Sequence, residues 1–99
     1  MPSFFVEDGT DRVELGDGFW VELKKAMSYQ DLGRLTADAD GLPSNVDLML
    51  VNIVDWNLTD EGGEVAPVTR ETVGRLRADV AARLLREIVA RNPFLASTT

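Results

Sequence analysis

The sequence contains no histidine and no cysteine. The absence of cysteine excludes disulfide bonds and thiolate nucleophiles, and without either residue type the usual zinc sites cannot form. The absence of histidine removes the imidazole base on which Ser-His-Asp and Cys-His catalysis depend. Most catalytic designs are therefore excluded, and we expect a protein that is not an enzyme and that uses no cofactor.

Basic residues are also scarce, since 10 Lys and Arg stand against 17 Asp and Glu and give a net charge of −7. A negative net charge is unfavourable for binding the phosphate backbone of nucleic acids, so we do not expect nucleic acid as a partner. Residues 1–50 carry ten acidic and four basic side chains, and the first half is therefore the acidic one. No apolar run approaches the ~20 residues that span a bilayer, and no signal-peptide pattern is present. We expect a cytoplasmic protein with no membrane partner.

Length limits the chain to one hydrophobic core, because it has 99 residues, of which 44% are hydrophobic. We predict a single domain over residues 1–99, with a β-hairpin region at 1–25 and a helical region at 28–92.

Alternation of apolar and polar residues predicts the β-hairpin. Two alternating runs, 12–15 and 19–24, flank the turn sequence Gly16-Asp17-Gly18. Helices must cover the apolar face, because two or three short strands are not stable alone. The expected fold class is α+β, with an N-terminal antiparallel β-hairpin or three-stranded sheet packed on about three helices. The apolar face of the hairpin would consist of Val13, Leu15, Phe19, Val21 and Leu23.

Helices are predicted over much of the remaining chain. Ser28 and Ser44 are suitable N-caps, and a helical turn capped by Thr69 leads into a last helix over 77–91. The helix expected over 46–58 is apolar at nine of its thirteen positions. Such a helix is either central in the domain or has a second face that contacts another protein. The predicted core consists of Leu50, Ile53, Val54, Leu76, Val80, Leu84 and Ile88.

The segment 36–47 has the spacing of a calcium-binding EF-hand loop. Asp38 and Asp40 would take the third and fifth positions and Asp47 the twelfth, where oxygen ligands converge on the cation. Thr36 replaces the usual first aspartate, and Asp47 is too short for the usual bidentate glutamate. We therefore favour a capped turn between helices, with an EF-hand-like calcium module as a remote alternative.

Trp20 is a candidate for contact with a partner protein. The alternation that places Val21 on the apolar face turns Trp20 to the opposite side, and an exposed tryptophan is typical of contact surfaces. Alternatively, a bulge at 16–18 shifts the register and packs Trp20 into the core.

Four other side chains are candidates for partner binding. Met49 and Trp56 belong to the predominantly apolar segment and would line an adaptable hydrophobic groove. Arg83 and Arg86 of the last helix form either a solvated face or a basic surface that meets the acidic half of a neighbouring copy.

Four short motifs follow one another along residues 11–90. They are Leu15-Gly-Asp-Gly-Phe-Trp-Val-Glu-Leu-Lys24, Ser28-Tyr29, Val54-Asp-Trp-Asn-Leu-Thr-Asp60 and Pro67-Val-Thr-Arg-Glu-Thr-Val73. In this order they resemble small morphogenesis proteins of tailed bacteriophages, many of them tail assembly chaperones. The resemblance implies a non-catalytic protein that binds the tape measure protein in the host cytoplasm and helps to recruit tail-tube subunits around it.

The alternative is a virion structural protein of the capsid, the head-to-tail connection or the tail. Such a subunit would contact capsid, connector or tail proteins and stay in the particle. The acidic first half and the arginine-bearing last helix are compatible with complementary contacts between neighbouring copies, and hence with a homo-oligomer.

Overall fold

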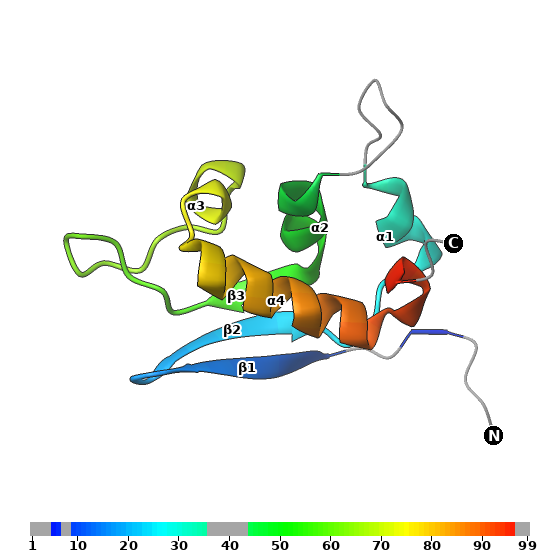
Figure 1. Ribbon diagram of the computed structural model, residues 1–99, viewed down its shortest axis with the longest axis horizontal. Coiled ribbons are helices and arrows are strands. Elements are labelled where there is room, and N and C mark those ends of the chain that lie inside the picture. The colour runs from blue at the N-terminus through cyan, green and yellow to red at the C-terminus, as the bar shows by residue number, and fades with distance from the viewer. Residues whose placement is uncertain (1–4, 7–8, 36–43, 97–99) are drawn as a thin grey trace.

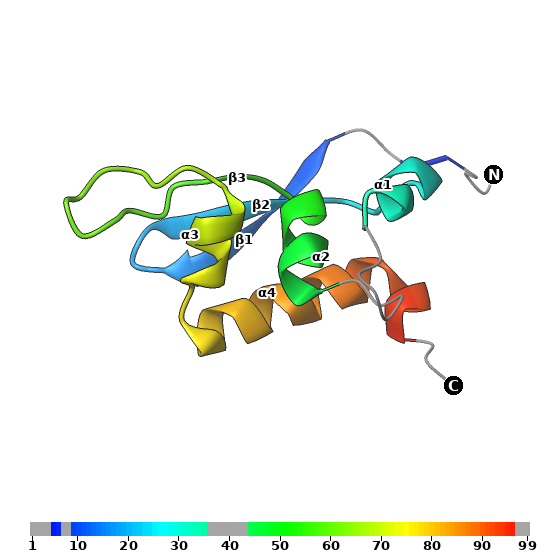
Figure 2. The ribbon, with the colours of Figure 1, turned by 90° about the horizontal axis from the view of Figure 1, so that it is seen from above.

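The computed structural model describes residues 5–6, 9–35 and 44–96. Three strands form one antiparallel sheet in the order β1-β2-β3, and the helices lie together on one side of it (Figures 1 and 2). The predicted α+β class is therefore confirmed. The elements are β1 (Thr10–Gly16), β2 (Phe19–Lys24), α1 (Tyr29–Gly33), α2 (Asn45–Asn52), β3 (Ile53–Trp56), α3 (Arg70–Gly74), α4 (Ala78–Arg91) and a 3-10 helix (Pro93–Ala96).

The β1–β2 hairpin forms where the alternation predicts it. Asp17 and Gly18 connect the strands with φ angles of 54° and 82°, which is the backbone of a turn that follows the natural twist of a hairpin. Val13 lies opposite Val21, and both side chains are buried. Phe19 differs from the prediction, because the register shifts beside Gly16 and leaves this ring 36% exposed.

The helix expected over 46–58 is wrong beyond residue 52. Helix α2 ends at Asn52, and Ile53 then takes extended backbone angles, although its N–H still donates to the carbonyl of Met49. The chain continues as β3, whose backbone pairs with β2. The excess of apolar residues therefore serves two successive elements, each of which contributes buried side chains to the core, Met49 from α2 and Ile53 and Trp56 from β3.

A bulge in β3 decides which of its side chains face the core. Glu22 lies opposite Asp55 and Leu23 opposite Ile53, so Val54 has no partner in the register. Ile53 is buried, whereas Val54 is 49% exposed. The prediction of Val54 as a core residue is therefore wrong, because the inserted residue turns its side chain outward.

The core lies between the sheet and helices α2, α3 and α4. Leu84 and Ile88 of α4 are fully buried against the sheet, as predicted. Leu50, Leu76 and Val80, also predicted as core residues, are half-buried and pack around this cluster. The buried cluster consists of Val13, Val21, Leu23, Met49, Ile53, Trp56, Val73, Leu84 and Ile88.

Side-chain caps begin three of the helices. Ser28, Ser44 and Thr69 accept hydrogen bonds from backbone N–H groups in the first turns of α1, α2 and α3, as their positions in the sequence predict. Helix α4 begins after Arg77, which makes no side-chain cap, and ends at Arg91, with Asn92 as its C-cap. Among the described residues, no helix combines the length and the apolar character needed to cross a membrane.

Two buried polar side chains join α1 and α4 to the end of β2. Asp31 accepts a hydrogen bond of 2.7 Å from Nζ of Lys24 and another from the N–H of Ser28. Burial raises the pKa of Asp31, but these hydrogen bonds outweigh it and hold the pKa below its ordinary value. Asn92 accepts a hydrogen bond of 2.7 Å from the N–H of Met27 through Oδ1. Both contacts fix the link between the sheet and the helical layer.

Candidate protein-binding surfaces

The face of the sheet opposite the helices carries Trp20. Its neighbours across β1 and β2 are charged, since Trp20 lies opposite Glu14 and Glu22 lies opposite Arg12. The guanidinium of Arg12 stacks 4.0 Å from the centre of the indole ring and forms an ion pair of 2.9 Å with Glu22. Trp20 therefore points away from the core, as the alternation predicts, and the alternative in which a bulge packs it into the core is wrong. Its role in contact with a partner stays a prediction.

Asn57 holds the hairpin beside Trp20. Its Oδ1 accepts a hydrogen bond of 2.7 Å from the N–H of Trp20, and its Nδ2 donates one of 2.9 Å to the carbonyl of Gly18. Sequence reasoning missed this residue, because only the pairing of β2 with β3 brings position 57 next to position 20. The sequence itself offers no signal for it beyond its place directly after an apolar run.

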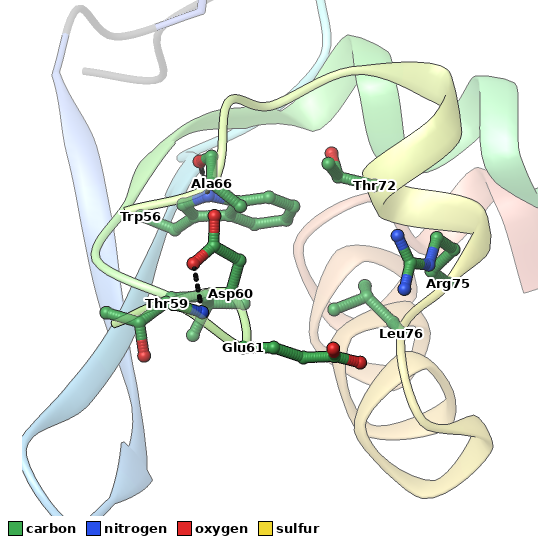
Figure 3. A pocket seen from close by; sticks show the side chains of 10 residues that line it. Trp56, Thr59, Asp60, Glu61, Ala66, Thr72, Arg75 and Leu76 are labelled. Carbon is green, nitrogen blue, oxygen red and sulfur yellow. Dashed lines mark hydrogen bonds between the residues drawn. The ribbon is translucent and has the colours of Figure 1, made fainter. Parts of the chain in front are cut away.

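The second surface is an open cleft of about 480 Å³ between the loop after β3 and the junction of α3 and α4 (Figure 3). Its size falls in the range of ligand-binding clefts, roughly 300–1,000 Å³. Charged and hydroxyl groups form the rim, including Thr59, Asp60, Glu61, Thr72 and Arg75. The apolar part of the lining consists of Trp56, Leu58, Ala66 and Leu76.

Hydrogen bonds within the loop make one wall of the cleft. The indole Nε1 of Trp56 donates to the carbonyl of Ala66 at 2.6 Å, and the N–H of Ala66 donates to the carbonyl of Leu58 at 2.8 Å. At the tip, Oδ1 of Asp60 accepts from the N–H groups of Gly62 and Glu64 at 2.9 and 3.2 Å. Trp56 thus supports the wall from the core side and also forms part of the lining.

Helix α3 and its cap make the opposite wall. The hydroxyl of Thr72 donates to the carbonyl of Pro67 at 2.6 Å, which fixes the entry of the chain into α3. An ion pair between Arg70 and Asp47 connects this helix to α2. The hydrogen bond from Arg70 holds the pKa of Asp47 below its ordinary value. One wall is therefore anchored to β3 through Trp56 and the other to α2 through Arg70.

Charges of both signs stand at the mouth of the cleft. Arg75 is exposed and forms no ion pair with any residue in the described part of the chain. Glu61 points from the loop toward the side on which Arg75 and Leu76 lie (Figure 3). Asp60 and Glu64 add exposed carboxylates at the loop tip. The arrangement suits an amphipathic segment that places an apolar side chain in the cleft and charged groups at its rim.

The other candidates from the sequence lie in different places. Met49 is 2% exposed in the core, and Trp56 is 3% exposed and reaches only the wall of the cleft. The expected groove on an exposed face of a helix over 46–58 is therefore wrong, because these residues pack inside the domain. Arg83 and Arg86 are exposed on α4 and pair with no other described side chain.

Of the three aspartates in the EF-hand-like segment, only Asp47 lies in the described part of the chain. Asp38 and Asp40 lie outside the described residues, and the carboxylate of Asp47 is engaged by Arg70. Within residues 5–6, 9–35 and 44–96, no three acidic side chains gather closely enough to hold a metal ion.

No family model matches the chain, and neither the curated proteins nor the solved structures include a match to it.

Proposed function

We propose that the protein is a non-catalytic tail assembly chaperone of a tailed bacteriophage, and that it binds a segment of the tape measure protein in the host cytoplasm. The observation that carries the proposal is the coincidence of the cleft with the motifs of the resemblance. The motif 54–60 supplies β3 and the beginning of the loop wall, and the motif 67–73 supplies the entry into α3. Five of the ten residues that line the cleft, Trp56, Leu58, Thr59, Asp60 and Thr72, therefore belong to the motifs that resemble phage chaperones.

The chemistry of the cleft supports an amphipathic helical or extended partner. Its lining accepts an aliphatic or aromatic side chain, and such anchors supply most of the affinity in protein contacts. The carboxylates of Asp60 and Glu61 attract basic groups of the partner, whereas Arg75 attracts an acidic one. The net charge of −7 keeps the chaperone soluble while it shields an apolar segment.

Binding of peptides that tile the tape measure protein of the same phage tests the proposal. The Arg75→Glu variant should weaken the best-bound peptide about tenfold, because it turns the exposed guanidinium at the rim into a carboxylate. The Arg86→Glu variant makes the same change of charge on the exposed face of α4 and should bind like the wild type. Loss of binding in Arg86→Glu but not in Arg75→Glu would place the contact on α4 and contradict a role for the cleft.

A structural role in the virion is the second candidate. The guanidinium groups of Arg83 and Arg86 favour it, since they are exposed and form no ion pair with the described residues of a chain whose first half is acidic. They are therefore available to a neighbouring subunit. A structural protein would keep these contacts in the particle in a fixed ratio to capsid, connector or tail subunits. A chaperone would leave before the particle is complete.

A further inference from the structure

The outer edge of β1 is unpaired within the described part of the chain. Strand β1 stands at one end of the sheet and pairs with β2 alone. Figure 1 shows it along the lower margin, with no described element below it. The edge of a strand presents backbone N–H and C=O groups, and another strand can continue the sheet by pairing with them.

The charges along β1 are complementary to those of an identical strand. Val13 is the midpoint of this strand of seven residues. If a two-fold axis passes through Val13 of an antiparallel pair, Arg12 of each copy lies directly opposite Glu14 of the other. Both charged side chains are on the open face of the sheet, because Val13 between them is buried on the core face. Opposite charges at directly opposed positions stabilise strand pairing.

The two registers centred one residue to either side of Val13 set like charges against each other. An axis at Arg12 would place two guanidinium groups face to face, and an axis at Glu14 would do the same with two carboxylates. A two-fold axis that passes between two residues would place a residue with a core-facing side chain opposite one whose side chain is on the open face. Such a register does not form, because directly opposed residues of paired strands have their side chains on the same face of the sheet. The register centred on Val13 is therefore favoured by its charges over the two next to it, and it is the one that pairs the whole of β1.

We propose that two copies of the protein form a symmetric dimer by antiparallel pairing of their β1 strands in the register centred on Val13. The two sheets of three strands then become one continuous sheet. Arg12 bridges Glu22 of its own chain, with which it pairs at 2.9 Å, and Glu14 of the second copy. Glu14 has no ion pair with the described residues of a single chain and gains one in the dimer.

The dimer contact is separate from the proposed chaperone site. The lining of the cleft includes Trp56 of β3, and β3 forms one edge of the sheet while β1 forms the other. Loss of dimerisation and loss of peptide binding can therefore be observed independently of each other.

A charge-swap experiment tests the register. In sedimentation equilibrium over a dilution series, the wild type should reach twice the chain mass of 10.9 kDa. The Arg12→Glu and Glu14→Arg variants should each raise the dissociation constant about tenfold or more, because each creates two like-charge pairs. An equimolar mixture of the two variants should dimerise again, because every position 12 then faces a position 14 of opposite charge.

Control variants test whether dimerisation depends on the charges of β1 or on any change of charge at the surface. Arg77→Glu and Glu71→Arg carry the same changes of charge at exposed positions before α4 and on α3, and each should dimerise alone like the wild type. A monomeric wild type at every concentration would overturn the proposal. Single variants that dimerise like the wild type, or a mixture that stays monomeric, would overturn it as well.

Hydrogen exchange of the wild type provides a measurement that needs no variant. This matters because Arg12 also pairs with Glu22 and stacks on Trp20, so Arg12→Glu changes contacts inside one chain. If the dimer forms through β1, amides in Thr10–Gly16 should exchange faster on dilution while amides of β3 keep their rates. Rates in β1 that do not depend on concentration would contradict the proposal.

Discussion

Truncation of Ile53 and of Val54 tests where the chain changes from helix to strand. Ile53 is 6% exposed in the core, whereas Val54 is 49% exposed at the bulge. Ile53→Ala removes buried carbons and leaves a cavity, so we expect a loss of about 2–5 kcal/mol in the free energy of unfolding. Val54→Ala should cost less than about 1 kcal/mol, because solvent already reaches its side chain.

Urea unfolding followed by tryptophan fluorescence and far-ultraviolet circular dichroism measures both effects. A small domain has about 5–15 kcal/mol of stability in total, so the Ile53→Ala change should shift the midpoint strongly while the Val54→Ala change should shift it little. In a continuous helix over 46–58, both side chains would belong to the core. Equal losses from the two substitutions would therefore refute the strand and its bulge.

Two buried polar contacts give further predictions. Asn92→Ala should cost about 1–3 kcal/mol in thermal or urea unfolding, because the buried N–H of Met27 loses its acceptor. Asn92→Asp keeps an acceptor oxygen for that N–H but cannot donate to the carbonyl of Ile88, so a variant as stable as the wild type would show that the donor side has no effect. Asp31 has a lowered pKa in the folded state, so its contribution is present above the unfolded value of about 4 and is lost as the pH falls through the folded value. The stability difference between wild type and Asp31→Asn should shrink on acidification from neutral pH to below about pH 4, and a difference that is constant over this range would contradict the role of the Lys24–Asp31 pair.

Local signals in the sequence explain which elements could be predicted. The turn residues Gly16-Asp17-Gly18 and the alternation around them specify the hairpin, and Ser28, Ser44 and Thr69 mark the starts of three helices. Each of these signals acts between residues that are close in the chain. Contacts of this kind can be inferred without knowledge of the rest of the fold.

The sequence did not predict the end of α2, because that end is set by pairing of the next residues with β2, which is distant in the chain. A run of apolar residues such as 46–56 fits both a buried helix and a buried strand, so its periodicity does not separate the two. The strand β3 forms because β2 offers a free edge at that point. The position of this edge follows from the assembled sheet and not from the sequence around Asn52.

The cleft could not be predicted for the same reason. Its walls come from the loop after β3 and from the end of α3. Each wall has its own hydrogen bond, from Trp56 to Ala66 and from Thr72 to Pro67, and only the assembled fold brings the two walls together. The sequence identified Trp56 as a partner-binding candidate but placed it on a helix. The place of Arg75 beside the cleft follows from the assembled fold and not from the sequence around it.

Quantitative mass spectrometry of infected cells and of purified particles tests the central claim most directly. A tail assembly chaperone binds its partner during assembly and then leaves, so we predict that the protein is abundant in infected cells, cross-links there to the tape measure protein, and is absent from purified virions. A constant ratio of this protein to capsid, connector or tail subunits in the particles would contradict the chaperone function and support the structural alternative.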